Sequence, residues 1–223
     1  MLATGSCQTS RVSVHERLRS ERLYLVCDER PDEFLAAALR GGVGIVQLRM
    51  KDRPDEAVLA AARRFAERCA EHGALFILND RPDLVQDAGA DGVHVGQDDM
   101  AVAVAREIVG PDRLIGLSTH TPTQIDAAAA AKVDYIGVGP VYETPTKPGR
   151  AAVGLELVHY AAAHARVPFF AIGGIDEANV AAVAAAGAER VAVVRALTES
   201  VDPERAARTL VEALRGEVQV GSA

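Results

Sequence analysis

The sequence predicts a single (β/α)8 barrel, and three observations favour that fold class. Eight short apolar runs alternate with amphipathic segments at a spacing of roughly 25 residues. The runs are continuously apolar, as is typical of strands buried on both faces of a parallel sheet. The main structural alternative, an open doubly wound sheet, is less well supported because no G-x-G-x-x-G sequence opens a first crossover.

The predicted strands are short and rich in Val, Ile, Leu and Phe. In chain order they are Leu23–Cys27, Gly44–Leu48, Leu75–Leu78, Gly92–Val95, Leu114–Leu117, Tyr135–Val138, Phe169–Ile172 and Val191–Val194. The segments between them are amphipathic and rich in Ala, Leu, Arg and Glu, which favour helices. The predicted helices are Pro31–Arg40, Asp55–His72, Ala101–Val109, Thr121–Ala131, Leu155–Ala165, Asp176–Ala186 and Pro203–Arg215.

Length and composition describe a folded, acidic chain. The 223 residues are 49% hydrophobic and 25% charged, which excludes a disordered protein and suits one large domain. We expect the domain over residues 21–216, with residues 1–20 as a tail or short outer helix and residues 217–223 as a C-terminal tail. The 24 Lys+Arg and 31 Asp+Glu residues give a net charge of −7, which argues against nucleic acid or an anionic membrane as a partner.

The sequence also indicates where the protein acts. Residues 1–20 lack the apolar core of a signal peptide, and no uncharged apolar stretch reaches the length of about 18 residues that a membrane span needs. The cysteines Cys7, Cys27 and Cys69 lack C-x-x-C spacing and are expected to be reduced core residues. We therefore expect a cytoplasmic protein. The sequence leaves the oligomeric state open, a homo-oligomer included.

Functional groups of a (β/α)8 barrel lie just beyond the carboxyl ends of its strands. After the second strand, alternation places Gln47, Arg49 and Lys51 on one side of the chain. An amide, a guanidinium and an ammonium that converge at a barrel mouth suit a multiply charged anion such as pyrophosphate. The alternative is a solvated strand end with incidental positive charge.

Acidic residues follow the next two strands. Asn79 and Asp80 end the third strand, and Asp98 and Asp99 follow the fourth. Carboxylates beside a cationic cluster suggest a Mg²⁺ ion that bridges to phosphate oxygens. The alternative is that each aspartate caps a helix. His94, inside the apolar pattern of the fourth strand, is more typical of a core histidine than of a catalytic one.

The later strand ends supply hydroxyls, a long loop and glycines. Ser118 and His120 follow the fifth strand, and Thr121 before Pro122 is a good helix N-cap. The sixth strand leads into the loop 139–149, whose length is typical of a lid. Further candidate groups for phosphate are the loop residues Thr144, Thr146 and Lys147, and, after the last two strands, Gly174, Val194 and Arg195.

Together these segments resemble the thiamine-phosphate synthase family. The matching stretches run in order from about Leu23 to Leu197, and two of them are specific, VHVGQDD and GPVYETPTKPG. The full stretches, which contain these two motifs, are LYLVCD, GGVGIVQLRMK, FILNDRPDLVQDAGADGVHVGQDDM, IGLSTHT, DYIGVGPVYETPTKPG, VGLEL, FFAIGGI and GAERVAVVRAL. The resemblance implies a transferase that joins 4-amino-2-methyl-5-hydroxymethylpyrimidine diphosphate to 4-methyl-5-hydroxyethylthiazole phosphate, or its carboxylated form, giving thiamine phosphate and pyrophosphate.

The resemblance also implies roles for the motif residues. Asp80 and Asp99 would hold Mg²⁺, with Asp98 as the neighbour that does not. Ser118 would lie against the pyrimidine and the departing pyrophosphate. The catalytic set would be Ser118, Lys147, Arg49 and Lys51. The substrate-binding set would be Gln47, Arg49, Lys51, Asn79, Ser118, Thr144, Thr146, Lys147 and Gly174, with the backbone of Val194 and Arg195. The family reaction is dissociative, with loss of pyrophosphate before the thiazole nitrogen attacks.

Two other functions remain as hypotheses at this point. A thiazole tautomerase on the same barrel would use His120 as its acid–base group and would need neither a diphosphate nor a metal. A non-catalytic barrel would only bind a phosphorylated ligand and act as a regulatory module. Lys51, Asn79, Asp80 and Asp99 favour the synthase over both.

Overall fold

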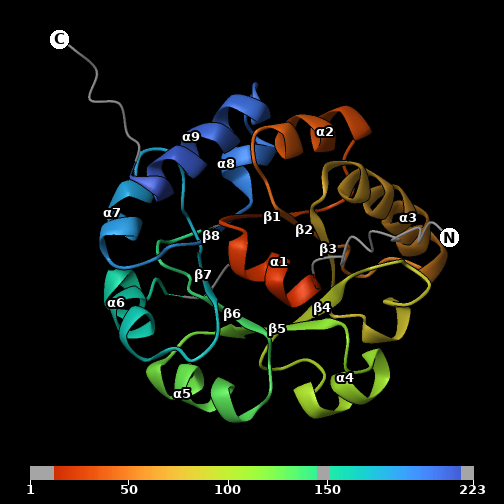
Figure 1. Cartoon of the computed structure of the whole chain (residues 1–223), viewed down its shortest axis with the longest axis horizontal. Helices are drawn as coiled ribbons and strands as arrows, with labels where there is room; N and C mark the ends of the chain where they lie inside the picture. The colour runs from red at the N-terminus through yellow and green to blue at the C-terminus, as the bar shows by residue number, and fades with distance from the viewer. Residues whose placement is uncertain (1–12, 145–150, 217–223) are drawn as a thin grey trace, which may run out of the picture.

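The computed structural model describes residues 13–144 and 151–216, and its strands fall where the apolar runs predict them. They are β1 (Leu23–Cys27), β2 (Ile45–Leu48), β3 (Leu75–Asn79), β4 (Gly92–Val95), β5 (Leu114–Thr119), β6 (Tyr135–Val138), β7 (Phe169–Ile172) and β8 (Val191–Val193). Each strand pairs in parallel with the next, and β8 returns to β1, so the sheet closes on itself. The predicted (β/α)8 barrel is confirmed (Figure 1).

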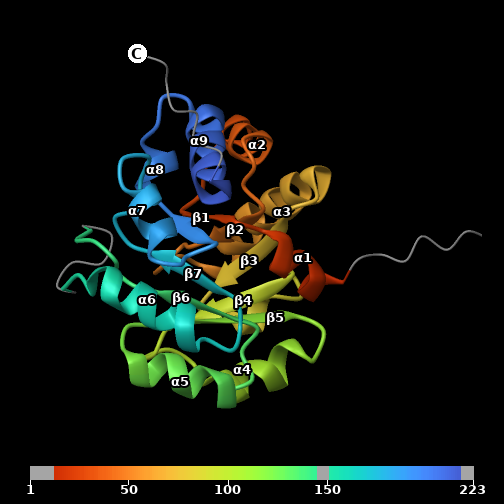
Figure 2. The ribbon, with the colours of Figure 1, turned by 60° about the vertical axis from the view of Figure 1, so that its left-hand side comes forward.

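Helices surround the barrel, and one further helix lies across an end of it (Figures 1 and 2). They are α1 (Val14–Ser20), α2 (Asp32–Arg40), α3 (Asp55–His72), α4 (Val102–Val109), α5 (Pro122–Ala130), α6 (Gly154–His164), α7 (Val180–Ala185), α8 (Arg195–Thr198) and α9 (Pro203–Arg215). Between β3 and β4 the chain forms only a 3₁₀ turn, η1 (Pro82–Leu84). Within the described ranges, no helix is both long and apolar enough to cross a bilayer.

Helix α7 begins at Val180 rather than at Asp176, where the sequence predicts its start. The intervening residues form a turn held by side chains. The Asp176 carboxylate accepts a hydrogen bond from the Ala178 N–H, and the Asn179 amide oxygen accepts one from the Asp176 N–H. Asp and Asn side chains compete in this way with helical backbone bonds, so the helix starts later.

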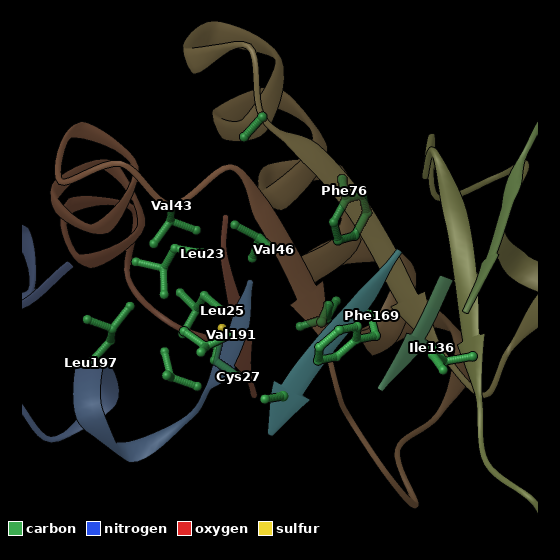
Figure 3. Close-up of a cluster of buried hydrophobic side chains, with 14 of the residues drawn as sticks. Leu23, Leu25, Cys27, Val43, Val46, Phe76, Ile136, Phe169, Val191 and Leu197 are labelled. Carbon is green, nitrogen blue, oxygen red and sulfur yellow. The ribbon is translucent and has the colours of Figure 1, made fainter. Parts of the chain in front are cut away.

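Period-two alternation along the strands divides the apolar residues between two clusters. Leu23 and Leu25 of β1 belong to an outer cluster between the sheet and the helices, part of which Figure 3 displays. Tyr24 and Val26 of the same strand belong to an inner cluster inside the barrel. All five residues of β1 are buried. The strands are continuously apolar because both faces are covered.

Helix α1 closes the amino-terminal end of the barrel. Leu18 is buried in the inner cluster, and three polar contacts tie the helix to loops that precede strands. His15 Nε2 lies 3.1 Å from Asp134 Oδ1, Arg17 donates to the Gly73 carbonyl, and the Arg19 carbonyl accepts a hydrogen bond from Arg190. The end of the barrel opposite the strand carboxyl termini is therefore covered, and access to the interior is from the carboxyl end.

Asp134 is the centre of this closure. Its carboxylate, whose side chain is 14% exposed, also accepts hydrogen bonds from Arg106 at 2.7 Å and from the Ile115 N–H at 2.7 Å. We expect Asp134→Ala to lower the free energy of unfolding by about 2–3 kcal/mol, because it leaves the Ile115 N–H without its acceptor and removes the carboxylate partner of the half-buried Arg106 guanidinium. Urea titration measures the change.

Asp126→Ala is the matched control, since Asp126 is exposed and, within the described ranges, accepts a side-chain hydrogen bond from the Tyr160 hydroxyl alone. It should change the free energy of unfolding by less than about 0.5 kcal/mol. Equal effects of the two substitutions would contradict the central role of Asp134.

Candidate active site

A cavity of about 280 Å³ opens at the carboxyl end of the barrel. Its walls combine polar side chains from the strand ends with apolar groups of the barrel interior. The cavity brings together the predicted site residues Gln47, Arg49, Lys51, Asn79, Asp80, Asp99, Ser118, Thr144, Gly174, Val194 and Arg195. Thr146 and Lys147 lie outside the described residues.

The cationic side of the cavity follows β2. Gln47, Arg49 and Lys51 all line it, whereas Leu48 packs in the outer cluster, as strand alternation predicts. Among the described residues, the Arg49 guanidinium forms no ion pair, while Lys51 Nζ lies 3.1 Å from Asp80 Oδ2. Arg49 therefore offers an uncompensated positive charge to an anion in the cavity.

A carboxylate pair faces this cationic side. Asp80 follows β3 with a positive φ of 59°, and its N–H donates to the His94 carbonyl, which fixes the turn against β4. The Asn79 amide donates to Asp80 Oδ2 at 2.6 Å. Burial raises the pKa of the Asp80 carboxyl, the adjacent Asp99 carboxylate raises it further, and Lys51 opposes both effects. Two carboxylates in contact, one of them half-buried, favour binding of a cation.

The helix-capping alternative for these aspartates is wrong. Helix α4 begins after Ala101 without a side-chain cap, and the turn η1 has none either. Asp99 instead accepts a hydrogen bond from the Gly96 N–H at 2.9 Å, which holds its carboxylate at the cavity wall. The predicted N-cap at Thr121, by contrast, is confirmed, because its side chain accepts from the Gln124 N–H and Pro122 follows.

Sequence reasoning missed the aromatic floor of the cavity. Tyr24, Tyr135 and Phe170 form a cluster of edge-to-face rings with centroids 5.3 to 5.9 Å apart, and His94 lies against Tyr135. All four line the cavity. The signal was present in the strand alternation, because tyrosine and histidine stand at inward positions of strands that otherwise carry aliphatic residues.

The polar groups at the carboxyl end of β5 are held in place by hydrogen bonds. Ser118 Oγ lies 3.0 Å from His94 Nε2. The His120 Nδ1–H donates to the Gly139 carbonyl, and the His120 N–H donates to the Gln124 side chain at 2.7 Å. Both Ser118 and His120 line the cavity, so the structure places them as the sequence predicts.

The last two strand ends supply backbone to the cavity. Gly174 has a φ of 65°, and a side chain there would collide with Tyr142 and the Glu143 carbonyl. Close approach of the loop after β6 therefore requires glycine. Val194 precedes the short helix α8, and the Arg195 side chain extends toward Glu199, with 3.8 Å between Nη1 and Oε2. The expected helical start after β8 is present.

The profile of the thiamine monophosphate synthase family matches residues 23–197, which contain all of these strand ends. The chain belongs to this family. It is 50% identical over 218 residues to thiamine-phosphate synthase of Mycobacterium tuberculosis, a match that covers 90% of this chain and 98% of that protein.

Other relatives in this family are longer. Thiamine-phosphate synthase of a Nostoc species is 52% identical over 204 residues, but the match covers 90% of this chain and only 58% of that protein. Among solved structures, thiamine phosphate pyrophosphorylase of Pyrococcus furiosus superposes with a TM-score of 0.82 at 28% identity, covering 92% of this chain and 100% of the other. A 3-hexulose-6-phosphate synthase of Salmonella typhimurium shares the fold, with a TM-score of 0.68 at 20% identity over 88% of this chain and 99% of the other.

The raised pKa of Asp80 has a consequence for stability. A carboxyl whose pKa is higher in the folded state contributes stability at low pH, and this contribution is lost as pH rises through the folded pKa. In metal-free buffer near neutral pH, Asp80→Asn should therefore raise the melting temperature. The difference should shrink below the ordinary carboxyl range, where the wild-type group is protonated.

Asp83→Asn is the control of opposite sign. The Arg81 guanidinium lowers the pKa of Asp83, so its contribution is present near neutral pH and is lost in acid. This variant should melt at a lower temperature than the wild type near neutral pH. A destabilised Asp80→Asn would show that the ion pair with Lys51 outweighs burial.

Proposed function

We propose that this chain is a thiamine-phosphate synthase. It would join 4-amino-2-methyl-5-hydroxymethylpyrimidine diphosphate to 4-methyl-5-hydroxyethylthiazole phosphate, or its carboxylated form, and release pyrophosphate. The observation that carries the proposal is one cavity that combines the cations Arg49 and Lys51, the carboxylates Asp80 and Asp99 and an aromatic floor. Family membership and the names of the relatives support it.

The pyrimidine diphosphate is assigned to the side of the cavity formed by β2, β3 and β5. Arg49 and Lys51 would neutralise the diphosphate, and an uncompensated guanidinium suits its paired oxygens. Gln47, Asn79 and Ser118 would make hydrogen bonds to the same substrate. The pyrimidine ring would enter the aromatic floor, where its flat faces can pack against side-chain rings.

The thiazole phosphate is assigned to the opposite side of the cavity. Backbone at Gly174 and at the start of α8, from Val194 to Arg195, would bind its phosphate, because the first N–H groups of a helix have no intrahelical acceptor. Thr144, Thr146 and Lys147 of the loop after β6 would complete the site. The methylene carbon of the pyrimidine and the nitrogen of the thiazole would then face one another across the cavity.

The residues present fit a Mg²⁺ ion held by Asp80 and Asp99. Their carboxylates are in contact, and burial together with this contact raises the pKa of Asp80, so a cation relieves the repulsion. Magnesium commonly takes one or two carboxylates and completes its shell with water and substrate phosphates. The described residues contain no group of three His, Cys, Asp or Glu side chains that could hold a metal, so the proposed site rests on the two carboxylates alone. When bound, the ion would neutralise charge on the diphosphate.

The chain's own residues would favour a dissociative reaction. Arg49, Lys51 and Lys147 stabilise the negative charge that develops on the leaving pyrophosphate as the C–O bond breaks. In the part of the chain that the structure describes, the cavity is reached from the carboxyl end of the barrel alone, which would limit access of water to the pyrimidine-stabilised methylene cation until the thiazole nitrogen attacks. Such a path uses electrostatic stabilisation rather than a strong base.

The domain, the cellular location and the partners are part of the same proposal. The barrel of residues 21–216, closed at its amino-terminal end by helix α1 (Val14–Ser20), would form the catalytic domain of a cytoplasmic protein whose partners are its two small substrates. A thiazole tautomerase would need neither Lys51 nor the carboxylate pair, and a purely binding barrel would need no group to stabilise a leaving pyrophosphate. The site contains all of these groups, which favours the synthase.

Purified protein with both substrates and Mg²⁺ should release pyrophosphate and form thiamine phosphate. Asp99→Asn should lower kcat/KM by roughly 100-fold, since it removes one of two charged metal ligands. Asp98→Asn, the neighbouring substitution with the same loss of charge, should retain most activity. Chromatography of the product measures both. Absence of thiamine phosphate with authenticated substrates would refute the proposal, and equal losses would refute the metal assignment.

Lys51→Met should lower kcat/KM for the pyrimidine diphosphate by roughly 100-fold through loss of a cation at the leaving group. Lys132→Met makes the same change of charge and side chain beyond α5, away from the cavity. Steady-state kinetics at matched ionic strength should show little change for the control. A similar loss in both variants would indicate an effect of net charge alone.

A further inference from the structure

A continuous series of hydrogen bonds crosses the barrel along the wall and floor of the cavity and connects Gln47 with Ser118. Gln47 Nε2 lies 2.6 Å from the Tyr24 hydroxyl, which lies 2.9 Å from the Tyr135 hydroxyl. The Tyr135 hydroxyl lies 3.3 Å from His94 Nδ1, and His94 Nε2 lies 3.0 Å from Ser118 Oγ. The five side chains come from five different strands, β2, β1, β6, β4 and β5, so closure of the barrel brings them together. Figure 1 labels these strands.

The first donor and the burial of the hydroxyls together give the direction of the bonds. An amide nitrogen can only donate, so the Tyr24 hydroxyl accepts from Gln47 Nε2. A hydroxyl oxygen can accept twice, but the buried Tyr24 proton then needs an acceptor, and its contact among the described residues is the Tyr135 hydroxyl. In this arrangement the Tyr135 hydroxyl donates to His94 Nδ1. A neutral imidazole that accepts at Nδ1 carries its proton on Nε2, and this proton points to Ser118 Oγ.

Burial and packing inside the barrel maintain this direction of the hydrogen bonds. Tyr24 and Tyr135 are 2% and 0% exposed, so a hydroxyl proton turned away from its partner would be buried without an acceptor. Gly116 of β5 provides the space, because a Cβ atom there would collide with the Tyr135 ring and with His94 Nδ1. Burial also raises the pKa of both tyrosines, so each keeps its proton at neutral pH.

We propose that this series of hydrogen bonds holds Ser118 as a hydrogen-bond donor toward the cavity, with His94 and Tyr135 as positioning residues. Because Ser118 Oγ accepts from His94, its single proton is available for an acceptor atom of the ligand. The identity of the ligand rests on the proposed function, in which this acceptor atom belongs to the pyrimidine diphosphate. If the bonds ran in the opposite direction, the Ser118 hydroxyl would donate its proton to His94 and could only accept a hydrogen bond from the ligand.

The first test is the position of the His94 proton in the free protein. Histidine labelled with ¹⁵N, assigned with the variant His94→Gln, should give the signal of an Nε2-protonated ring. A proton on Nδ1, or a doubly protonated ring at neutral pH, would overturn the proposal. This measurement needs no substrate, so it decides the direction of the hydrogen bonds even if the wild type forms no thiamine phosphate and the proposed function fails.

The second test is a double-mutant cycle on the coupling reaction. Tyr135→Phe should lower kcat/KM for the pyrimidine diphosphate roughly tenfold, as expected for loss of one aligned hydrogen bond, and leave KM for the thiazole phosphate unchanged. In a Ser118→Ala background the same substitution should cost almost nothing, because there is no hydroxyl left to position.

Tyr160→Phe is the matched control, since its hydroxyl donates to Asp126 on the outer helices. It should change neither the His94 signal nor the kinetics. Full activity of Tyr135→Phe in the wild-type background, or an equal loss with and without the Ser118 hydroxyl, would overturn the positioning role and leave Tyr135 as a packing residue.

Discussion

Closure of the parallel sheet is the constraint on which the rest of the structure depends. Once β8 pairs with β1, every strand has two neighbours, all carboxyl ends meet in one ring, and alternate side chains point to a shared interior. Residues far apart in sequence become neighbours because their strands end at the same rim. Gln47 and Ser118 are joined through three other strands in this way.

The two ends of the barrel use polar groups for opposite purposes. At the amino-terminal end, Asp134 receives donors from α1, α4 and the backbone, so its charge is matched by hydrogen bonds. At the carboxyl end, Arg49 has no ionic partner among the described residues and Asp80 contacts another carboxylate. The first arrangement stabilises the fold. The second leaves charge available for ligands, at a cost to stability.

The charge of the whole chain differs from the charge of its candidate site. A net charge of −7 disfavours polyanionic partners, yet Arg49 and Lys51 make one side of the cavity locally positive. Small phosphorylated ligands respond to the field inside a cavity, because the surrounding low dielectric strengthens nearby charges relative to distant ones. Composition disfavours polyanionic partners, whereas the strand ends indicate the ligand chemistry.

The sequence by itself determined the barrel and most of its candidate site. Continuous apolar runs specify parallel strands, alternation specifies that Gln47, Arg49 and Lys51 share a side, and the strand-end rule specifies where to look. These are local periodicities or general properties of one fold, so the one-dimensional pattern carries them.

Only the tertiary structure decided which groups touch. The contact of Asp80 with Asp99, the aromatic floor, and the series of hydrogen bonds through His94 depend on strand register and on the space that Gly116 leaves. Tyrosines and a histidine at inward positions of apolar strands cannot be told from core residues in the sequence. The late start of α7 depends on side-chain hydrogen bonds within the preceding loop. Hydrogen bonds and ion pairs require distances of about 3 Å, and periodicity fixes the side of a strand but not the position of an atom.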